Sequence, residues 1–325
     1  MNILKFSSKL LAIALFTSFS TAYAGPIGGN ASTPISFVVP SSPGASSDVI
    51  ARILGKAVTK TAGNPVIVEN HPGANGIVGT QYVLNRKADG LTLLTTTSSV
   101  IVFNKFVFKK LPYDPQMDFE PLMVFARGTM MLGISPKLPY STLPKLIEDA
   151  KKHPTKLNFG YATATQQLVG EIFQTISNTK FTFIAYKTNA AMLQAVITGE
   201  IDAAVSDPAG FASFIKSKKV NAVAVTAPKR LTGYPDTPTM TEQGIDFSMQ
   251  TINGVFAKKG TPRTTRGALI NVLKKSVTAP ELRAYDESNA MDDFAIFGDE
   301  AQHYVEKMVN TTAHLVKKSG FQPTM

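Results

Sequence analysis

The sequence contains no cysteine and only four histidines in 325 residues. Without cysteine the chain has no disulfide, no thiolate nucleophile, no cysteine-ligated zinc or iron–sulfur cluster and no lipidated N-terminal cysteine. The histidines, His71, His153, His303 and His314, are too few and too scattered along the chain to indicate a metal site. We therefore expect neither a bound metal nor a cofactor.

Acidic residues are also scarce: 23 of them stand against 33 lysines and arginines, which gives a formal net charge of +10. The basic residues are spread along the chain, and the densest runs are pairs such as Lys109-Lys110 and Lys151-Lys152. No aromatic-interleaved basic motif accompanies them. The pattern therefore favours a solvated basic surface over nucleic-acid binding.

The chain is long and apolar enough to build a sizeable core. Apolar residues make up 44% of it and charged residues 17%, a composition that is not typical of a disordered protein. At about 150 residues per domain, the length predicts two domains.

The first 24 residues have the pattern of a secretory signal peptide. Lysines precede the apolar run Leu10–Phe16, and Ala22-Tyr23-Ala24 forms a small-residue cleavage signature. The run is shorter than the ~20 apolar residues that a membrane-spanning helix needs, which argues against an anchor. No later segment reaches that length. We therefore expect cleavage after Ala24 and export to a bacterial periplasm.

Short aliphatic runs alternate with helical periodicity through the first hundred residues. Ile35–Val39, Pro65–Val68 and Leu91–Thr97 predict strands, whereas apolar residues recur at helical spacing over residues 50–58. An alternating order of strands and helices predicts an α/β fold with a mostly parallel sheet. Asp48, or a serine just before it, is the expected N-cap of the first helix.

Two polar loops follow predicted strands. In the first, Pro43–Asp48, small residues let the backbone approach a ligand, and the N–H groups of a helix start can hold an anion. The same composition suits a plain turn, so both interpretations stay open on this motif alone. The second loop, Tyr186–Ala190, offers a phenol and a cation.

The glycines at positions 73, 76 and 79 are spaced differently from the dinucleotide-binding fingerprint. We interpret them as a tight turn with close packing of a helix on the sheet. The sequence contains no Walker loop, no nucleophile elbow, no H-E-x-x-H motif and no Ser/His/Asp set. Nothing in it indicates catalysis, and we do not expect an enzyme.

An ordered set of segments resembles the solute receptors of tripartite tricarboxylate transporters, the Bug or TctC family. The segments are Pro40–Arg52, Val66–Thr80, Ala88–Leu94, Leu111–Asp114, Asp118–Pro121, Tyr186-Lys187, Gly199–Asp202, Val225–Arg230, Pro235–Gly244 and Gly260–Pro262. Each segment alone is a weak signal. Their common order over nearly the whole mature chain is a specific one.

The resemblance implies a type II periplasmic-binding-protein fold, the Venus flytrap, with two α/β lobes joined by a two-strand hinge. Residues 33–126 and 252–325 would form the first lobe and residues 127–251 the second. A small organic acid would bind in the cleft between them. The implied ligand-binding residues are Ser42, Gly44, Ser46, Ser47, Asp48, Thr97 and Ser98 in the first lobe, and Thr163, Thr165, Tyr186 and Lys187 in the second.

The chain differs from the family pattern at positions near the implied ligand. Ala45 stands where the family has a second glycine, Gln167 where histidine is usual, and Thr188-Asn189 where the family has Gly-Ser. These differences predict a reshaped second-lobe contact, so no particular acid is named. We expect Asp48 to cap the helix or orient water, with a ligand amine as the alternative.

The implied function is capture of the acid and its delivery to membrane transporter subunits by a monomeric receptor. The alternative is a receptor of the same fold that signals to a membrane sensor kinase. The sequence does not separate the two.

The signal peptide gives a first testable prediction. Protein recovered from the periplasm should begin with Gly25, because signal peptidase cuts after the small residue that ends the Ala-Tyr-Ala signature. N-terminal sequencing measures this directly. A periplasmic protein that still begins at Met1 would contradict the prediction.

Overall fold

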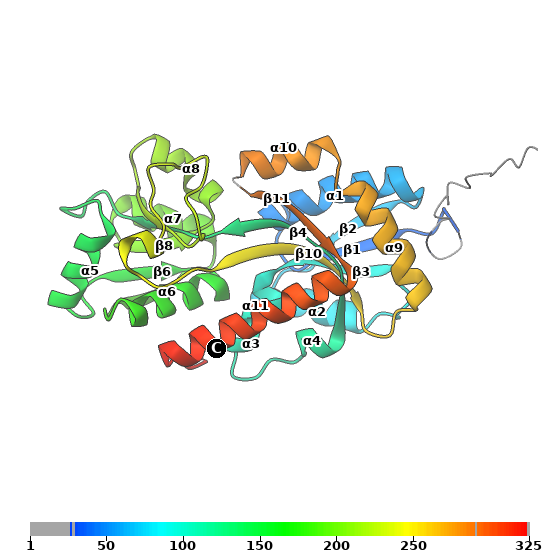
Figure 1. Cartoon of the computed structure of the whole chain (residues 1–325), viewed down its shortest axis with the longest axis horizontal. Coiled ribbons are helices and arrows are strands. Elements are labelled where there is room, and N and C mark those ends of the chain that lie inside the picture. Colours follow the sequence, from blue (N-terminus) through cyan, green and yellow to red (C-terminus); the bar gives the residue numbers. More distant parts are fainter. Residues whose placement is uncertain (1–26, 28–29, 290, 324–325) are drawn as a thin grey trace, which may run out of the picture.

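The computed structural model describes residues 27, 30–289 and 291–323. The expected signal peptide and its cleavage site after Ala24 lie outside these residues. The described chain forms two β-sheets, each with its own helices, that lie one after the other along the longest axis of the molecule (Figure 1). None of the described helices combines the length and the apolar character needed to cross a membrane.

The first sheet has six strands in the order β11-β4-β10-β3-β1-β2. Its strands are β1 (Ile35–Val39), β2 (Val66–Asn70), β3 (Thr92–Thr97), β4 (Phe119–Thr129), β10 (Gln250–Lys258) and β11 (Asp292–Phe297). β1 pairs in parallel with β2 and β3, whereas β10 pairs antiparallel with β3 and β4, and β11 antiparallel with β4. β1 is almost entirely buried, as expected for an aliphatic strand covered on both faces.

The second sheet has five strands in the order β7-β6-β8-β5-β9. Its strands are β5 (Met131–Ile134), β6 (Asn158–Tyr161), β7 (Thr182–Ala185), β8 (Ala203–Ser206) and β9 (Asn221–Val225). β6 is parallel with β7 and β8, and β5 runs antiparallel to β8 and β9. The two sheets confirm the predicted α/β class.

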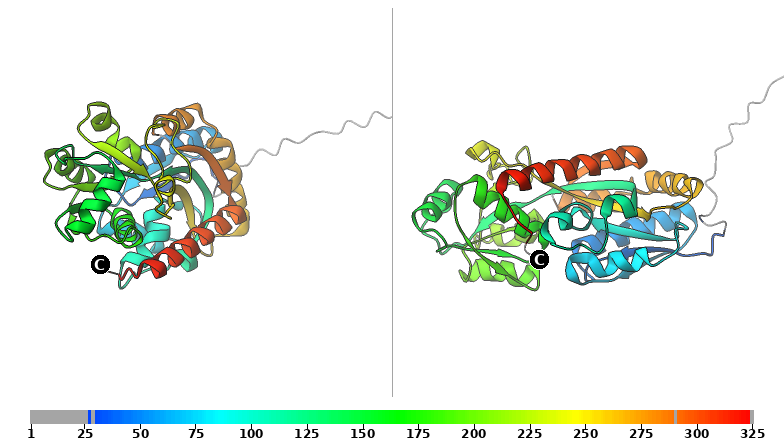
Figure 2. Two further views of the ribbon diagram at one scale, coloured as in Figure 1. Left: turned by 60° about the vertical axis from the view of Figure 1, so that its left-hand side comes forward. Right: turned by 90° about the horizontal axis from the view of Figure 1, so that it is seen from below.

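Helices cover both faces of the first sheet (Figures 1 and 2). Around the first sheet lie α1 (Ser46–Ala62), α2 (Ile77–Leu84), α3 (Asn104–Val107), α4 (Pro115–Asp118), α9 (Arg263–Ser276), α10 (Pro280–Ser288) and α11 (Gly298–Ser319), with the shorter turns η2 (Ala74–Gly76) and η3 (Ser99–Phe103). With the second sheet are α5 (Leu143–Lys152), α6 (Ala164–Ile176), α7 (Asn189–Thr198) and α8 (Pro208–Lys216), and the turn η4 (Thr241–Gln243). Successive residues of β4 face opposite sides. Met123 packs in one cluster with Leu54 of α1 and Leu269 of α9. Val124 packs in another with Val305 of α11.

The chain passes between the sheets twice. β4 ends at Thr129 in the first sheet, and β5 begins at Met131 in the second. The return passes through Met249, whose N–H donates to the Thr226 carbonyl at 2.9 Å, while the Thr226 hydroxyl donates to the Met249 carbonyl at 2.6 Å. β10 then pairs with β4 from Gln250 onward. These two neighbouring strands carry both covalent connections between the sheets.

A β-bulge interrupts the pairing of β4 and β10 close to this crossing. The register shifts between Thr251 and Asn253, and Ala126 takes a left-handed conformation with a φ of 49°. Ser98, buried after the end of β3, accepts a hydrogen bond from the Ile252 N–H at 3.3 Å. Bulges bend a strand and free backbone groups from the ladder, and here a serine satisfies one of those groups.

Side-chain packing also joins the sheets on the α11 side. α6, which belongs to the second sheet, packs against η3, α3 and α11. Val102 and Phe103 of η3 lie in the same buried cluster as Leu168 and Phe173 of α6. The two sheets therefore share one continuous apolar core on this side.

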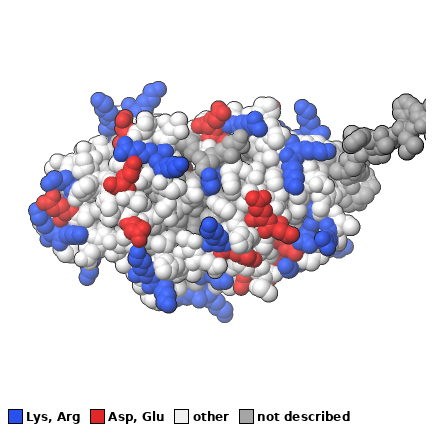
Figure 3. All heavy atoms as spheres, viewed as in Figure 1, with Lys and Arg blue, Asp and Glu red and all other residues white. Residues whose placement is uncertain are grey.

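Charged side chains of both signs are interspersed on the face of the molecule shown in Figure 3. Several form surface ion pairs, such as Lys152 with Glu148 at 2.7 Å and Arg230 with Glu242 at 2.9 Å. Pairs this exposed add little to stability.

The first helix begins differently from the prediction. Neither Asp48 nor a preceding serine is its N-cap; the N-cap is Ala45, which offers no side-chain acceptor. Asp48 lies in the first turn instead, and its carboxylate accepts a hydrogen bond from the Gly44 N–H at 2.9 Å. Asp48 is the third residue of α1, and its side chain accepts an N–H of the preceding loop, as the third residue of a capping box does. The helix therefore begins at Ser46, two residues before Asp48.

The predicted close packing of a glycine-rich helix on the sheet is confirmed at Gly79 of α2. A Cβ atom added there would lie 2.8 Å from the Cβ and 2.9 Å from the Cα of Pro40. Exposed Gly267 of α9 has the opposite environment, since no heavy atom would lie within 4 Å of an added Cβ.

These two glycines form a matched pair for a stability test. Alanine favours a helix over glycine by about 1 kcal/mol, so Gly267→Ala should raise the free energy of unfolding by up to that amount. Gly79→Ala should lower it by about 1–3 kcal/mol, because the clash with Pro40 outweighs the helix preference. Urea denaturation measures both changes. A Gly79→Ala protein as stable as the Gly267→Ala protein would show that the contact with Pro40 is not restrictive.

Candidate functional site

The carboxyl ends of the parallel strands point toward the crossing in both sheets. In the first sheet Thr97, the last residue of β3, pairs with Asn253 of β10. In the second sheet Ser206, the last residue of β8, pairs with Met131 at the start of β5. Since β1 is parallel with β3, and β6 and β7 are parallel with β8, the loops after these strands lie between the sheets. Ligands of open α/β sheets bind at such strand ends.

The loop between β1 and α1 brings together the first group of predicted residues. Ser42, Gly44 and Ser46 are exposed, and Ser47 is half-buried. Gly44 has a φ of 81°, which glycine adopts without strain. α1 starts directly afterwards, so the loop also presents the first N–H groups of a helix. The Asp48 N–H is bonded to the Ala45 carbonyl at 2.9 Å.

Asp48 is only 3% exposed and holds this loop in shape. Its carboxylate accepts hydrogen bonds from the Gly44 N–H and the Asn70 amide, each at 2.9 Å. Arg52 approaches both carboxylate oxygens, at 2.9 and 3.1 Å. Asn70 also donates to the Ser41 carbonyl at 3.1 Å, which ties the loop to the end of β2. Asp48 is thus not the N-cap of α1 but a first-turn residue whose carboxylate orders the preceding loop.

Burial alone would raise the pKa of Asp48. Hydrogen bonds from Arg52, the Gly44 N–H and Asn70, with the charge of Arg52, outweigh that effect and lower the pKa from 3.8. The carboxylate is therefore ionised and paired at neutral pH.

The hydroxyls of Ser46 and Ser47 each have a partner. The Ser47 hydroxyl lies 2.7 Å from that of Ser41. The Ser46 hydroxyl lies 2.8 Å from the hydroxyl of Tyr285 on α10, a residue 239 positions away. Burial raises the pKa of Tyr285, and the charge of Asp207 adds to the rise. Asp207 is the N-cap of α8, the helix that follows β8 of the second sheet. Since its charge acts on Tyr285 of α10, Tyr285 lies on the side of the first sheet's helices that faces the second sheet.

The predicted residues at the end of β3, Thr97 and Ser98, accept hydrogen bonds from backbone N–H groups. The Thr97 hydroxyl accepts a hydrogen bond from the Ser99 N–H at 3.3 Å. Ser98 is 1% exposed, and its hydroxyl accepts the Ile252 N–H at the bulge. Thr97 is half-buried, so of the two it is the one with a solvent-accessible surface at the strand ends.

In the second sheet a chain of side-chain hydrogen bonds connects three strand ends. Thr163 caps α6 in a capping box with Gln166, whose side-chain oxygen accepts the Thr163 N–H at 3.0 Å. The Gln166 amide donates to Asn189 at 2.7 Å, at the start of α7. The Asn189 amide donates to the Ser206 hydroxyl at 3.1 Å, at the end of β8. Sequence reasoning did not select Gln166, Asn189 or Ser206 as site residues, and it placed no strand over β6, which precedes Gln166.

The remaining predicted residues near the second sheet differ in their burial and in their hydrogen-bond partners. Thr165 is 5% exposed in the first turn of α6. Lys187 is exposed in the loop after β7. The Tyr186 hydroxyl donates to Glu200 at 2.8 Å, beyond the C-terminal end of α7 and away from the strand ends. The structure therefore brings Thr163, Thr165 and Lys187 to the strand ends, but not the Tyr186 hydroxyl.

The candidate site offers hydrogen-bond donors and the cation of Lys187. Hydroxyls, helix N–H groups and an ammonium group surround the strand ends, and they suit an acceptor ligand. Among the residues that the structure describes, no cluster of three or more His, Cys, Asp or Glu is placed to hold a metal ion.

Sequence comparisons match most of the chain to known proteins. Residues 50–321 match the tripartite tricarboxylate transporter family receptor, TctC. BugT of Bordetella pertussis is 30% identical over 260 residues, which cover 78% of this chain and 80% of BugT.

Solved structures share the fold. Rpa4515 of R. palustris, solved with adipate, superposes with a TM-score of 0.82 at 24% identity and covers 90% of this chain and 99% of its own. MatC of Rhodopseudomonas palustris, solved with bound malate, gives a TM-score of 0.77 at 22% identity and covers 87% of this chain and 98% of its own. The family match spans most of the chain, and its fold is the one described above. The chain belongs to the TctC family of tripartite tricarboxylate transporter receptors, a family of solute-binding receptors.

Proposed function

We propose that the protein is a periplasmic receptor that captures a small organic anion, a carboxylate, and delivers it to a tripartite tricarboxylate-type membrane transporter. In this proposal residues 33–126 and 252–325 form one lobe, residues 127–251 form the other, and the ligand binds between them. The observation that carries the proposal is the family match over residues 50–321. The signal-peptide pattern of the first 24 residues supports the periplasmic location.

The arrangement of the helices favours an anion. α1, α6, α7 and α8 all begin at the carboxyl ends of strands, at the side where the two sheets meet. A helix N-terminus carries partial positive charge and N–H groups without intrahelical partners, so these helix starts attract a negative ligand. The buried Asp48 does not oppose this, because Arg52 neutralises it. Rpa4515 and MatC, which share the fold, were solved with adipate and malate, both dicarboxylates.

The proposed mechanism is closure of the lobes around the ligand. A ligand that contacts the β1–α1 loop and the loops of the second sheet stabilises the closed arrangement by its differential affinity for the two states. β4 and β10 form the hinge, since they carry both connections between the sheets. The Ser46 hydroxyl already bonds to Tyr285, so a ligand either replaces that bond or shares it.

A thermal-shift screen tests the ligand class. The panel contains dicarboxylates such as adipate and malate, tricarboxylates, aromatic acids, acidic amino acids, sugars and amines, with 1,6-hexanediol as the uncharged control for adipate. At 100 times its Kd a ligand adds about 2.7 kcal/mol to stability. For a chain of this size each kcal/mol raises Tm by about 2–4 °C. We expect only the carboxylates to raise Tm. Stabilisation by sugars or amines, with none from any acid, would refute the proposal that the ligand is an anion.

Loss of two hydroxyls tests the location of the site. Ser46→Ala with Ser47→Ala removes two donors from the β1–α1 loop, and a hydrogen bond to a charged ligand is worth about 1.5–3 kcal/mol. Affinity for the acid found in the screen should fall at least tenfold (~1.4 kcal/mol). Ser217→Ala is the control, because exposed Ser217 bonds within its own helix end. Calorimetry measures the affinity of the unchanged protein, the double variant and the control. Equal affinity in all three would show that the ligand is bound by other residues.

A further inference from the structure

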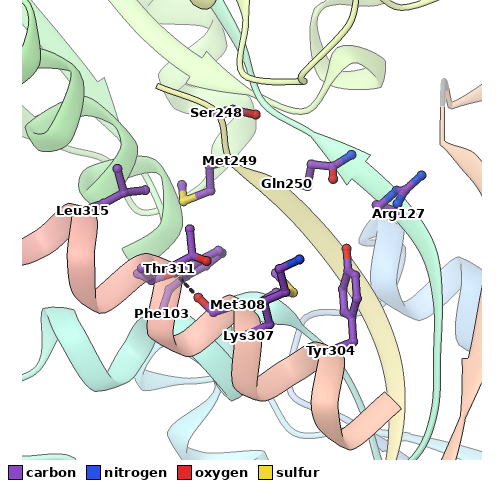
Figure 4. Close-up of a pocket in the computed structure, with 11 residues that line it drawn as sticks. Phe103, Arg127, Ser248, Met249, Gln250, Tyr304, Lys307, Met308, Thr311 and Leu315 are labelled. Atoms are coloured by element: carbon purple, nitrogen blue, oxygen red, sulfur yellow. Dashed lines mark hydrogen bonds between the residues drawn. The ribbon is translucent and has the colours of Figure 1, made fainter. Parts of the chain in front are cut away.

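α6, α7 and α8 begin around one small hydrogen-bonded group of side chains at the strand ends of the second sheet. Its members are Gln166 of α6, Asn189 of α7 and Ser206 at the end of β8. The cavity beside α11 that Figure 4 shows has none of the three in its lining. Gln166 is 4% exposed and Ser206 is fully buried, whereas Asn189 is half-buried. Asn189 is therefore the member of the group that a ligand at these strand ends can reach.

The backbone sets the orientation of the Gln166 amide. Its Oε1 accepts hydrogen bonds from the Ala162 N–H at 2.7 Å and from the Thr163 N–H at 3.0 Å. Only the oxygen of an amide accepts hydrogen bonds, so the reversed amide would place its N–H groups against two other N–H groups. Nε2 must therefore point the other way, where it donates to the Asn189 Oδ1 at 2.7 Å.

The bond from Gln166 fixes the Asn189 amide in turn. Since Oδ1 accepts from Gln166, Nδ2 points elsewhere and donates to the Ser206 hydroxyl at 3.1 Å. That hydroxyl also lies 3.3 Å from Oδ1 and can donate to it, which requires the same orientation. Nδ2 carries two N–H groups, and among the described residues Ser206 is its one acceptor. The second N–H is available to a ligand.

The start of α8 packs on the same group. A Cβ atom added to Gly210 would lie 2.7 Å from the Ser206 Oγ and 3.4 Å from the Asn189 Nδ2. Asp207 caps α8, and its Oδ1 accepts the Gly210 N–H at 2.7 Å, but it shares no hydrogen bond with Asn189. Exposed Lys187 precedes α7. These two charges have opposite signs, so hydrogen-bond polarity rather than net charge distinguishes ligands at this point.

We propose that Asn189 is a specificity-determining residue of the ligand site and that Gln166 is its positioning residue. The inference rests on the function proposed above and adds which group the second lobe accepts. Asn189 donates an N–H to an oxygen acceptor at the far end of the ligand. An ammonium group in that place would meet an N–H instead of an acceptor, which leaves two donors unpaired and disfavours amines.

Matched pairs of ligands test the acceptor. Calorimetry of the mature protein compares malonate, succinate, glutarate and adipate, each with the ω-amino acid of the same carbon number, in which an aminomethyl group takes the place of one carboxylate. Diacids should bind roughly tenfold or more tightly than their amino acids, because a hydrogen bond to a charged group is lost. Equal or tighter binding of the amino acids would overturn the inference. Binding of no diacid would also overturn it, whereas the proposed function would then depend on the wider screen.

Two substitutions test the residues. Gln166→Glu keeps an oxygen for the Ala162 and Thr163 N–H groups but cannot donate to Asn189, whose amide should then reverse and present Oδ1. Asn189→Ala removes the donor. Each should weaken the tightest-binding diacid roughly tenfold or more and reduce its advantage over the amino acid. Gln194→Ala removes an exposed amide further along α7 and should change neither value.

The double variant separates positioning from the added charge. The negative charge of Gln166→Glu acts in both backgrounds, whereas reversal of the amide needs Asn189. The factor by which Gln166→Glu weakens the diacid should therefore be roughly tenfold smaller when Asn189→Ala is also present. Lower pH should bring Gln166→Glu back toward the affinity of the unchanged protein, because the protonated side chain again donates to Asn189.

The outcomes that contradict the two roles are distinct. Equal factors in both backgrounds would show that Gln166 does not act through Asn189. Diacid affinity that is the same in Asn189→Ala as in Gln194→Ala would overturn the whole inference while leaving the proposed function in place. Circular dichroism confirms that each variant is folded. If Gln166→Glu does not fold, the comparison of Asn189→Ala with Gln194→Ala still decides whether Asn189 holds the ligand.

Discussion

The antiparallel pairing of β4 with β10 is the constraint on which the rest of the structure depends. Both strands belong to the first sheet, and both lead directly into the second, through Met131 on one side and Met249 on the other. Their pairing therefore fixes how the sheets face each other, and it brings the carboxyl ends of β1, β3, β6 and β8 to one region. Ser98 fastens the end of β3 to the same pair. Any movement of one sheet relative to the other must therefore bend these two strands.

One buried carboxylate orders the β1–α1 loop. Asp48 orients Gly44 and Asn70 around itself and is neutralised by Arg52. Because its folded pKa is lowered from 3.8, its contribution to stability is fully present above that value and is lost as the pH falls through the lower, folded pKa. Asp48 therefore stays ionised, and its contacts with the loop persist, throughout the neutral range.

Local patterns in the sequence predicted the parts of the molecule that depend on local physics. Alternating apolar runs identified the strands, and small residues between strand and helix located the loop around Gly44. The helix start was predicted less well, because a propensity rule favours a polar N-cap, whereas here Asp48 acts from inside the helix. Tyr285 could not be predicted at all, since its partner Ser46 is 239 positions away and only the packing of α10 on α1 joins them. The same holds for the bonds from Gln166 to Asn189 and onward, which need the strand order of the second sheet.

The crossing has two sides, and the bulge connects them. Ala126 adopts its left-handed conformation on β4, and Arg127, the next residue, has its guanidinium 4.6 Å from the ring centroid of Phe294 on β11. On the paired strand the Ile252 N–H at the bulge donates to Ser98, which directly follows the last residue of β3. β4 and β10 are paired on both sides of the bulge, so a change of twist in one strand is passed to the other. The bulge therefore links the ladder of the first sheet to both connections that lead into the second sheet, from Thr129 to Met131 and through Met249.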